Sequence, residues 1–213
     1  MKTLVLLACL VLPPLAAGAD APRHLIYLHG RIIQDQQSPR PRHPEWGYYE
    51  LEKILAAFRE RGFVVTGEIR PRGQSLSVSA DHVVEQVRHL LASGVPRSRI
   101  TVVGGSMGAA IALLASLRMQ QPEQRFVVLG ACMSATVPIL VEEHGRQPAG
   151  RILSFRDTSD ETSEPCPAWS NAGDAPASLM VREIVLSTGL HHGFLYRPLP
   201  EWVDPAAAWA VED

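Results

Sequence analysis

Short apolar runs alternate with helical patterns along most of the chain. Six runs are rich in valine, isoleucine and leucine, with no regular polar alternation, which is typical of strands buried on both faces of a parallel sheet. They cover residues 24–29, 63–69, 100–104, 126–131, 151–155 and 183–187. Because helical patterns separate them, the chain is predicted to form a sheet with helices on both faces.

The helical segments have distinct signatures. Residues 49–61 and 80–91 repeat apolar side chains at the spacing of an amphipathic helix, and residues 106–119 are small and apolar enough to pack on the sheet. A last helix is predicted from Asp204 as N-cap and Pro205 in its first turn, ending near Val211. The fold class is therefore α/β, a three-layer α/β/α sandwich with a mainly parallel six-stranded sheet.

Two irregular segments, residues 30–47 and 156–179, directly follow predicted strands. Both should lie at the carboxyl edge of the sheet, where open α/β folds bind their ligands. Arg31, Arg70 and Arg72 also follow strand ends and are candidates to hold an anionic group of a substrate, although exposed arginines are common in loops.

The first 19 residues have the layout of a secretory signal peptide. Lys2 precedes an apolar run from Leu4 to Leu12, and small residues end at Ala19. The run is too short for a membrane span. Lipidation at Cys9 is less favoured than cleavage after Ala19. We therefore expect residues 20–213 to form one exported domain, periplasmic or secreted.

Composition narrows the possible partners. The formal net charge is −2, with 22 acidic and 20 basic residues. Nucleic-acid-binding proteins usually carry a basic surface, so no nucleic-acid partner is expected. His82 and His89 stand seven residues apart on a predicted helix, too far for a pair of metal ligands, and neither a metal nor another cofactor is predicted.

The strongest local motif is Gly-Gly-Ser-Met-Gly at residues 104–108, between a predicted strand and an apolar helix. This Gly-x-Ser-x-Gly pattern is typical of a nucleophile elbow, in which a serine occupies a strained turn and side chains at the flanking glycines would clash. The motif predicts Ser106 as a nucleophile. Three fixed positions recur by chance too often for the motif to stand alone.

The chain resembles the α/β-hydrolase superfamily across residues 24–213 in the order of its elements and motifs. The resemblance implies a minimal, lidless form of that fold. The strand 25–28 ends in His29-Gly30, which resembles the strand and turn that supply half of the family's oxyanion hole. The N–H groups of Met107 and Arg31 are the candidate donors, although only one glycine follows His29 and the glycine-rich form of this turn is absent.

The resemblance also supplies the partners of Ser106. His192, in the sequence Leu-His-His-Gly-Phe after the last strand, matches the catalytic histidine, with His191 as the alternative. Asp160 matches the acid that orients the histidine, while Asp157 and Glu161 remain possible. Ser106, Asp160 and His192 follow the serine–acid–histidine order of this fold.

Two cysteines, Cys132 and Cys166, remain after the leader. In the fold that the resemblance implies they follow adjacent strands, so a Cys132–Cys166 disulfide is plausible in an exported protein. Two buried free thiols are the alternative.

The predicted function is hydrolysis of ester-type bonds in a small-molecule substrate through an acyl-enzyme on Ser106. Thioesterases and peptidases use the same triad, and a non-catalytic binding module of the same fold is the alternative from another class. The sequence leaves the physiological substrate and the oligomeric state open.

Overall fold

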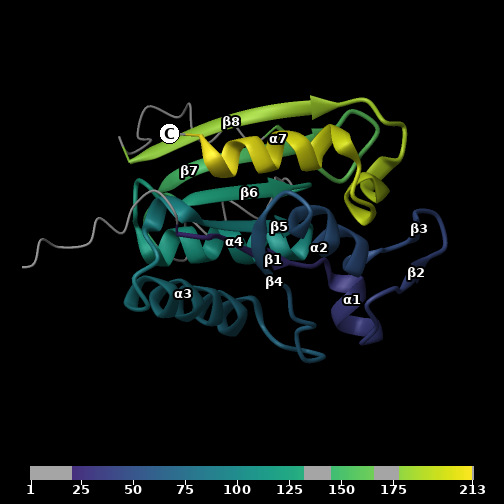
Figure 1. Ribbon diagram of the computed structural model, residues 1–213. Coiled ribbons are helices and arrows are strands. Elements are labelled where there is room, and N and C mark those ends of the chain that lie inside the picture. The colour runs from purple at the N-terminus through teal and green to yellow at the C-terminus, as the bar shows by residue number, and fades with distance from the viewer. Residues whose placement is uncertain (1–20, 132–144, 166–177, 213) are drawn as a thin grey trace, which may run out of the picture.

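A computed structural model describes residues 21–131, 145–165 and 178–212. The core is a six-stranded, fully parallel sheet in the order β4-β1-β5-β6-β7-β8 (Figure 1). The strands are β1 (Arg23–Leu28), β4 (Phe63–Thr66), β5 (Ile100–Gly105), β6 (Arg125–Leu129), β7 (Gly150–Asp157) and β8 (Leu179–Leu186). All six predicted strands are confirmed, with shifted ends.

Helices cover both faces of the sheet. α2 (Leu51–Arg59) and α7 (Pro200–Val211) lie on one face, and α3 (Leu76–Ala92) and α4 (Met107–Met119) lie on the other. The shorter elements are α1 (Arg31–Gln36), the hairpin strands β2 (Arg42–His43) and β3 (Gly47–Tyr48), and the 3-10 helices η1 (Arg97–Arg99) and η2 (His191–Tyr196). The predicted three-layer sandwich is confirmed.

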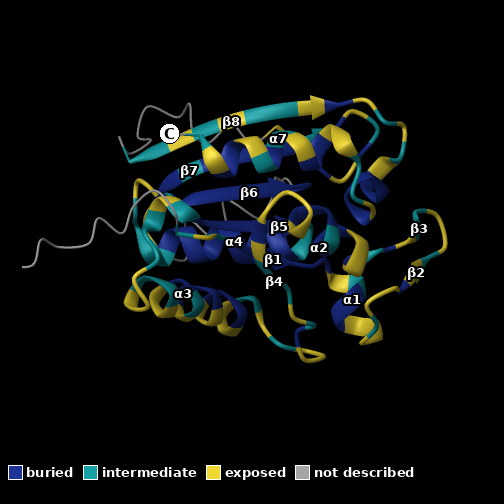
Figure 2. Ribbon diagram, viewed as in Figure 1, coloured by how far each residue is buried: buried dark blue, intermediate teal, exposed yellow. Residues whose placement is uncertain are grey.

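Alternate strand side chains enter two separate cores. Leu25 and Tyr27 of β1 pack with α2 and α7, whereas Ile26 and Leu28 pack with α3 and α4. The central strands β5 and β6 are buried along their whole length, but the edge strand β8 alternates between partly buried and exposed residues (Figure 2). This edge position explains why Arg182 and Glu183 are accommodated in β8.

The last helix begins one turn earlier than predicted. Leu199 is its N-cap and Pro200 its first residue, so Asp204 and Pro205 lie inside α7. The buried residues Trp202 and Val203 extend the apolar face upstream of Asp204, and packing therefore outweighs the second proline signal. Asp204 instead pairs with Arg61, which follows α2.

Other predictions fall outside the described residues. These are the leader with its cleavage site after Ala19, and the Cys132–Cys166 disulfide. Among residues 21–131, 145–165 and 178–212, no helix is long and apolar enough to cross a membrane.

The turn from β5 to α4 packs against the end of β1. A Cβ atom on Gly108 would lie 1.9 Å from the carbonyl oxygen of Leu28, and one on Gly104 would lie 2.3 Å from the carbonyl oxygen of Gly108. Both obstacles are backbone atoms, which cannot move as a flexible side chain can. The two glycines therefore allow the helix to start directly beside the sheet.

We expect Gly108→Ala to lower the free energy of unfolding by at least about 3 kcal/mol, because the new methyl group overlaps the backbone of β1. Denaturant unfolding measures the change. Gly62→Ala is the matched control: Gly62 has a φ of +86° but no atom within 4 Å of the added Cβ, so it should cost only about 1 kcal/mol. Equal losses in the two variants would contradict the steric explanation.

Candidate active site

Ser106 lies at the carboxyl end of β5, at the junction with α4. Its backbone has φ 55° and ψ −119°, a strained conformation for a residue with a side chain. Its N–H donates to the carbonyl of Leu129 on β6 at 2.8 Å, and its carbonyl accepts from Ala109 at 2.9 Å. The turn is thus fixed from both sides and leaves the half-buried serine at the edge of the sheet.

The loops after β7 and β8 bring a carboxylate and an imidazole together. Asp160 follows the end of β7 by three residues, and His192 lies in η2 after β8. Oδ2 of Asp160 and Nδ1 of His192 are 2.7 Å apart, and the two residues are only 4% and 5% exposed. If the proton is on Nδ1, this hydrogen bond leaves Nε2 unprotonated and able to accept a proton.

Thr162 completes the surroundings of Asp160. Its hydroxyl and its N–H both donate to Oδ1 of Asp160, at 2.6 and 3.0 Å. Burial alone would raise the pKa of Asp160, but the hydrogen bonds from His192 and Thr162 and the attraction to His192 outweigh it and lower the pKa to about 2. The carboxylate is therefore ionised at neutral pH.

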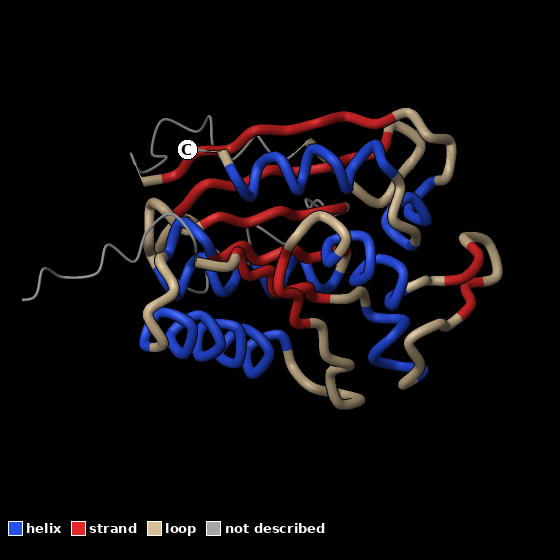
Figure 3. The backbone as a smooth tube through the Cα atoms, viewed as in Figure 1, coloured by secondary structure: helices blue, strands red, loops and turns tan. Residues whose placement is uncertain are grey.

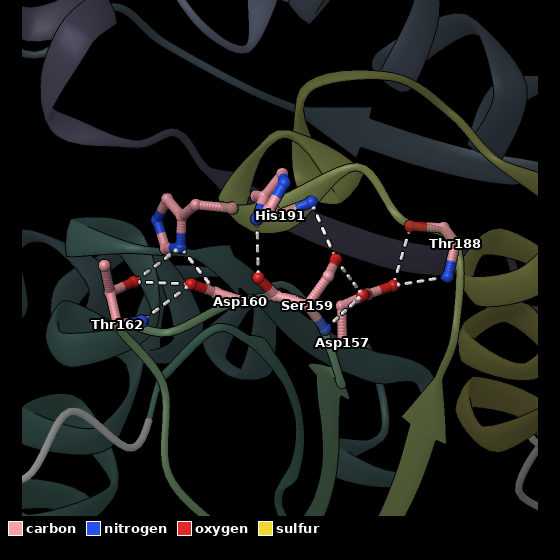
Figure 4. Close-up of polar contacts among 7 residues, drawn as sticks. Asp157, Ser159, Asp160, Thr162, Thr188 and His191 are labelled. Carbon is pink, nitrogen blue, oxygen red and sulfur yellow. Dashed lines mark hydrogen bonds and ion pairs between the residues drawn. The ribbon is translucent and has the colours of Figure 1, made fainter.

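Asp157 and Glu161, the alternative candidates for the acid, do not lie against His192. Asp157, the last residue of β7, accepts hydrogen bonds from Ser159 and from Thr188 on the loop after β8 (Figure 4). It therefore joins two neighbouring loops and does not contact His192. Glu161 is exposed.

The alternative histidine, His191, is also placed elsewhere. It is exposed, and its Nδ1 lies 2.7 Å from the carbonyl oxygen of Ser159 (Figure 4). Its N–H donates to the hydroxyl oxygen of Ser159 at 2.9 Å. His191 thus attaches η2 to the loop after β7, whereas its neighbour His192 faces Asp160.

The two proposed oxyanion donors begin helices. Met107 is the first residue of α4 and Arg31 is the first residue of α1, so the N–H of each has no acceptor within its own helix. The sheet register sets Leu28 level with Gly104, which places the following Gly30 beside Ser106. A Cβ on Gly30 would lie 3.5 Å from Cβ of Ser106. Both helix starts therefore border the serine.

A cavity of about 440 Å³ opens at this point, lined by Ser106, His192, Gly30 and Arg31 among others. The other charged side chains at its wall are Asp35 and Arg42, both exposed. In the part of the chain that the structure describes, no three histidine, cysteine, aspartate or glutamate side chains are grouped so as to hold a metal ion.

Trp46 also borders the site. The hairpin of β2 and β3 stands beyond the carboxyl ends of the strands (Figure 3). It places the Trp46 ring 5.1 Å from the imidazole of His192. The His43 ring stacks on Trp46 at 3.9 Å, and the Tyr196 ring lies 5.7 Å from it in a T-shaped arrangement. No sequence motif marks Trp46, because its role depends on how the hairpin folds over η2.

The three arginines that follow strand ends have different positions. Arg31 lines the cavity and Arg72 is exposed. Arg70 is buried and donates to the carbonyl of His29 at 2.5 Å, so its side chain belongs to the protein interior.

Comparison with known proteins agrees with this architecture. The sequence profile of the phospholipase/carboxylesterase family matches residues 21–145. That range includes the Ser106 turn and the His29-Gly30 turn but ends before Asp160 and His192. No curated protein sequence gives a significant match.

Solved structures match over most of the chain at low identity. SOBER1 from Arabidopsis thaliana aligns with a TM-score of 0.57 and 13% identity, over 90% of this chain and all of the other. A thermophilic esterase from Thermogutta terrifontis aligns with a TM-score of 0.57 and 17% identity, over 92% of this chain and 84% of the other. At these identities the likeness concerns the fold.

The fold and these matches define an α/β hydrolase. Within that class, the chain belongs to the phospholipase/carboxylesterase family, whose profile covers more than half of its length. The family indicates a hydrolase of ester bonds.

The lowered pKa of Asp160 links this residue to acid stability. Its folded-state pKa of about 2 lies below its ordinary value of 3.8, so its stabilising contribution is complete above about pH 4 and is lost as the pH falls through 2. Urea unfolding measures the free energy of unfolding of wild type and of Asp160→Asn at each pH. We expect the advantage of wild type over the variant to be about 2 kcal/mol larger at pH 5 than at pH 1.5. A difference that does not change with pH would contradict the shift.

Proposed function

We propose that the protein is a serine esterase that cleaves small carboxylic esters through an acyl-enzyme on Ser106. The single observation that carries the proposal is the buried 2.7 Å contact between Asp160 and His192 beside a strained serine. His192 and Ser106 line the same cavity. A binding module has no need for a desolvated carboxylate held against an imidazole, which supports catalysis over binding.

In the first half of the proposed reaction, Oγ of Ser106 attacks the ester carbonyl carbon while Nε2 of His192 takes the hydroxyl proton. Asp160 stays ionised and stabilises the imidazolium that forms. The carbonyl oxygen becomes negative and accepts hydrogen bonds from the N–H groups of Met107 and Arg31. The imidazolium then protonates the departing alcohol as the bond from carbon to the ester oxygen breaks.

The second half repeats these steps with water. His192 removes a proton from water, the hydroxide oxygen attacks the acyl carbon, and the proton returns to Oγ of Ser106 as the carboxylic acid leaves. The backbone donors serve both tetrahedral intermediates. Because they are fixed by the starts of two helices, they need little reorganisation during the reaction.

The cavity supports a small substrate. Its volume of about 440 Å³ accommodates a short acyl chain and a modest alcohol, and its mouth is open to solvent at the exposed residues Arg42 and Pro44. Trp46 also lines a second cavity of about 520 Å³ on the side of Glu45 and Glu161. We infer that its indole separates two subsites, one for each part of the ester.

We expect a fluorophosphonate probe to label the protein at Ser106, and Ser106→Ala to abolish both labelling and hydrolysis of aryl esters. Ser93→Ala, which removes an exposed hydroxyl at the end of α3, should label as wild type does. Mass spectrometry of the modified peptide measures the labelling. A wild-type protein that does not react would favour the binding module.

Two matched pairs test the partners of Ser106. Asp160→Asn and His192→Ala should each lower kcat by at least about 10³-fold. The first removes the carboxylate that sets the tautomer of His192, and the second removes the base itself. Asp157→Asn and His191→Ala should change kcat by less than about tenfold, since neither contacts the His192 ring. Steady-state kinetics on one aryl ester measures all four variants. A larger loss in Asp157→Asn than in Asp160→Asn, or in His191→Ala than in His192→Ala, would disprove the assignment.

Trp46→Ala should broaden the substrate range, because the indole borders both cavities. We expect kcat/KM for an octanoyl aryl ester to rise at least about tenfold relative to the acetyl ester. The control is Tyr48→Ala on the same hairpin, where the ring is 43% exposed and contacts Arg40. An unchanged ratio in Trp46→Ala would show that the indole does not limit the substrate.

A further inference from the structure

Arg70 connects three segments behind the proposed oxyanion hole. It lies between β4 and α3 and is 7% exposed. Its Nη2 donates to the carbonyl of His29 at 2.5 Å, and its Nε donates to Oε1 of Gln34 on α1 at 3.0 Å. The side chain of Gln37, at the end of α1, donates to the carbonyl of Arg70 at 2.9 Å. These bonds attach α1 and the turn before it to the loop after β4.

His29 is locked in the same network. It is completely buried, and its Nε2 accepts from the N–H of Arg70 at 3.0 Å. The proton is therefore on Nδ1, which donates to the carbonyl of Gly30 at 2.9 Å. Burial, assisted by the charge of Arg70, lowers the pKa of His29 to about 4, so the imidazole is neutral at physiological pH.

Within the described part of the chain, no carboxylate balances the charge of Arg70 by forming an ion pair with it. Burial lowers the pKa of Arg70 only to about 10, so it stays protonated. Tyr27 and Tyr49 lie nearby, but burial raises the pKa of both phenols, to about 12 for Tyr49. Both phenols are therefore uncharged.

A buried cation without a counter-ion is costly to fold. The free-energy cost of burying the cation is offset when a negative charge forms close to the cation in a site with little water. The turn that Arg70 holds leads directly from His29 through Gly30 to Arg31, the proposed donor. The same turn packs on the first turn of α4, since a Cβ on Gly108 would lie 2.9 Å from the carbonyl oxygen of His29.

We propose that Arg70 is a positioning residue of the oxyanion hole. It fixes the turn so that the N–H of Arg31 faces Ser106, and its unbalanced charge favours the negative oxygen of the tetrahedral intermediate. This inference rests on the proposed esterase function. It differs from the substrate role that its place after a strand suggested, because the guanidinium contacts His29 and Gln34 in the interior.

The test combines kinetics with an anionic mimic of the intermediate. Arg70→Met should lower kcat about 10- to 100-fold with less than a threefold change in KM, because the charge matters only once the oxygen becomes negative. Benzeneboronic acid forms a tetrahedral anion on an active serine, and its inhibition constant should weaken by a similar factor. If Arg70 were needed only for folding, Arg70→Met would not weaken the binding of benzeneboronic acid by the same factor by which it lowers kcat.

Two further variants complete the design. Arg70→Lys keeps the charge but lacks the planar fork that donates to His29 and Gln34 at once, so kcat should fall by a smaller factor than in Arg70→Met. Arg118→Met removes an arginine that bonds Ser77 and Asp81 on α3, far from Ser106, and should leave kcat within twofold. Thermal unfolding reports the stability of each variant.

The outcomes are distinct. Wild-type kcat and boronate inhibition in Arg70→Met would overturn the proposal and leave the esterase function intact. If Arg70→Met does not fold, wild-type values in Arg70→Lys would overturn it equally. A wild-type protein that neither hydrolyses esters nor binds the boronate would overturn the esterase function together with this inference.

Discussion

The close approach of α4 to the end of β1 is the constraint on which the rest of the site depends. Only hydrogen fits at Cα of Gly104 and Gly108, because backbone atoms occupy the space where a Cβ would be. This contact forces the strained backbone of Ser106 and brings the first turn of α4 next to the His29-Gly30 turn. Ser106 and the first turn of α4 are thus positioned by backbone packing, whereas the turn before Arg31 is also held by the side chain of Arg70.

Asp160 and His192 are positioned in a different way. They lie on the segments after β7 and β8, which hydrogen bonds of Asp157 and Ser159 join to each other. Asp157 joins the two loops through Ser159 and Thr188, and Asp160 is then free to face His192. The parallel pairing of β7 with β8 brings both loop starts to the same edge of the sheet.

The sequence allowed much of this arrangement to be predicted. Runs of β-branched residues identified all six strands because buried parallel strands have little polar content, and the Gly-x-Ser-x-Gly motif located the turn because its steric requirement is local. Helix and strand ends were less accurate, as α7 shows, since tertiary burial of Trp202 decides where that helix begins. Trp46 carried no motif, and Arg70 was predicted to hold a substrate, because the contacts of both with the site and the interior join segments far apart in sequence.

Asp157 and Asp160 have different contacts, and this difference has an evolutionary consequence. The residue that maintains the shape of the loops is not the residue that contacts the imidazole, although only two residues separate them. With the role proposed for Asp160, a neutral residue at this position would leave the hydrogen bonds of Asp157 between the loops in place while removing the group that orients the base. In the proposed mechanism, a single substitution would therefore separate a hydrolase from a binding protein for the same ligand.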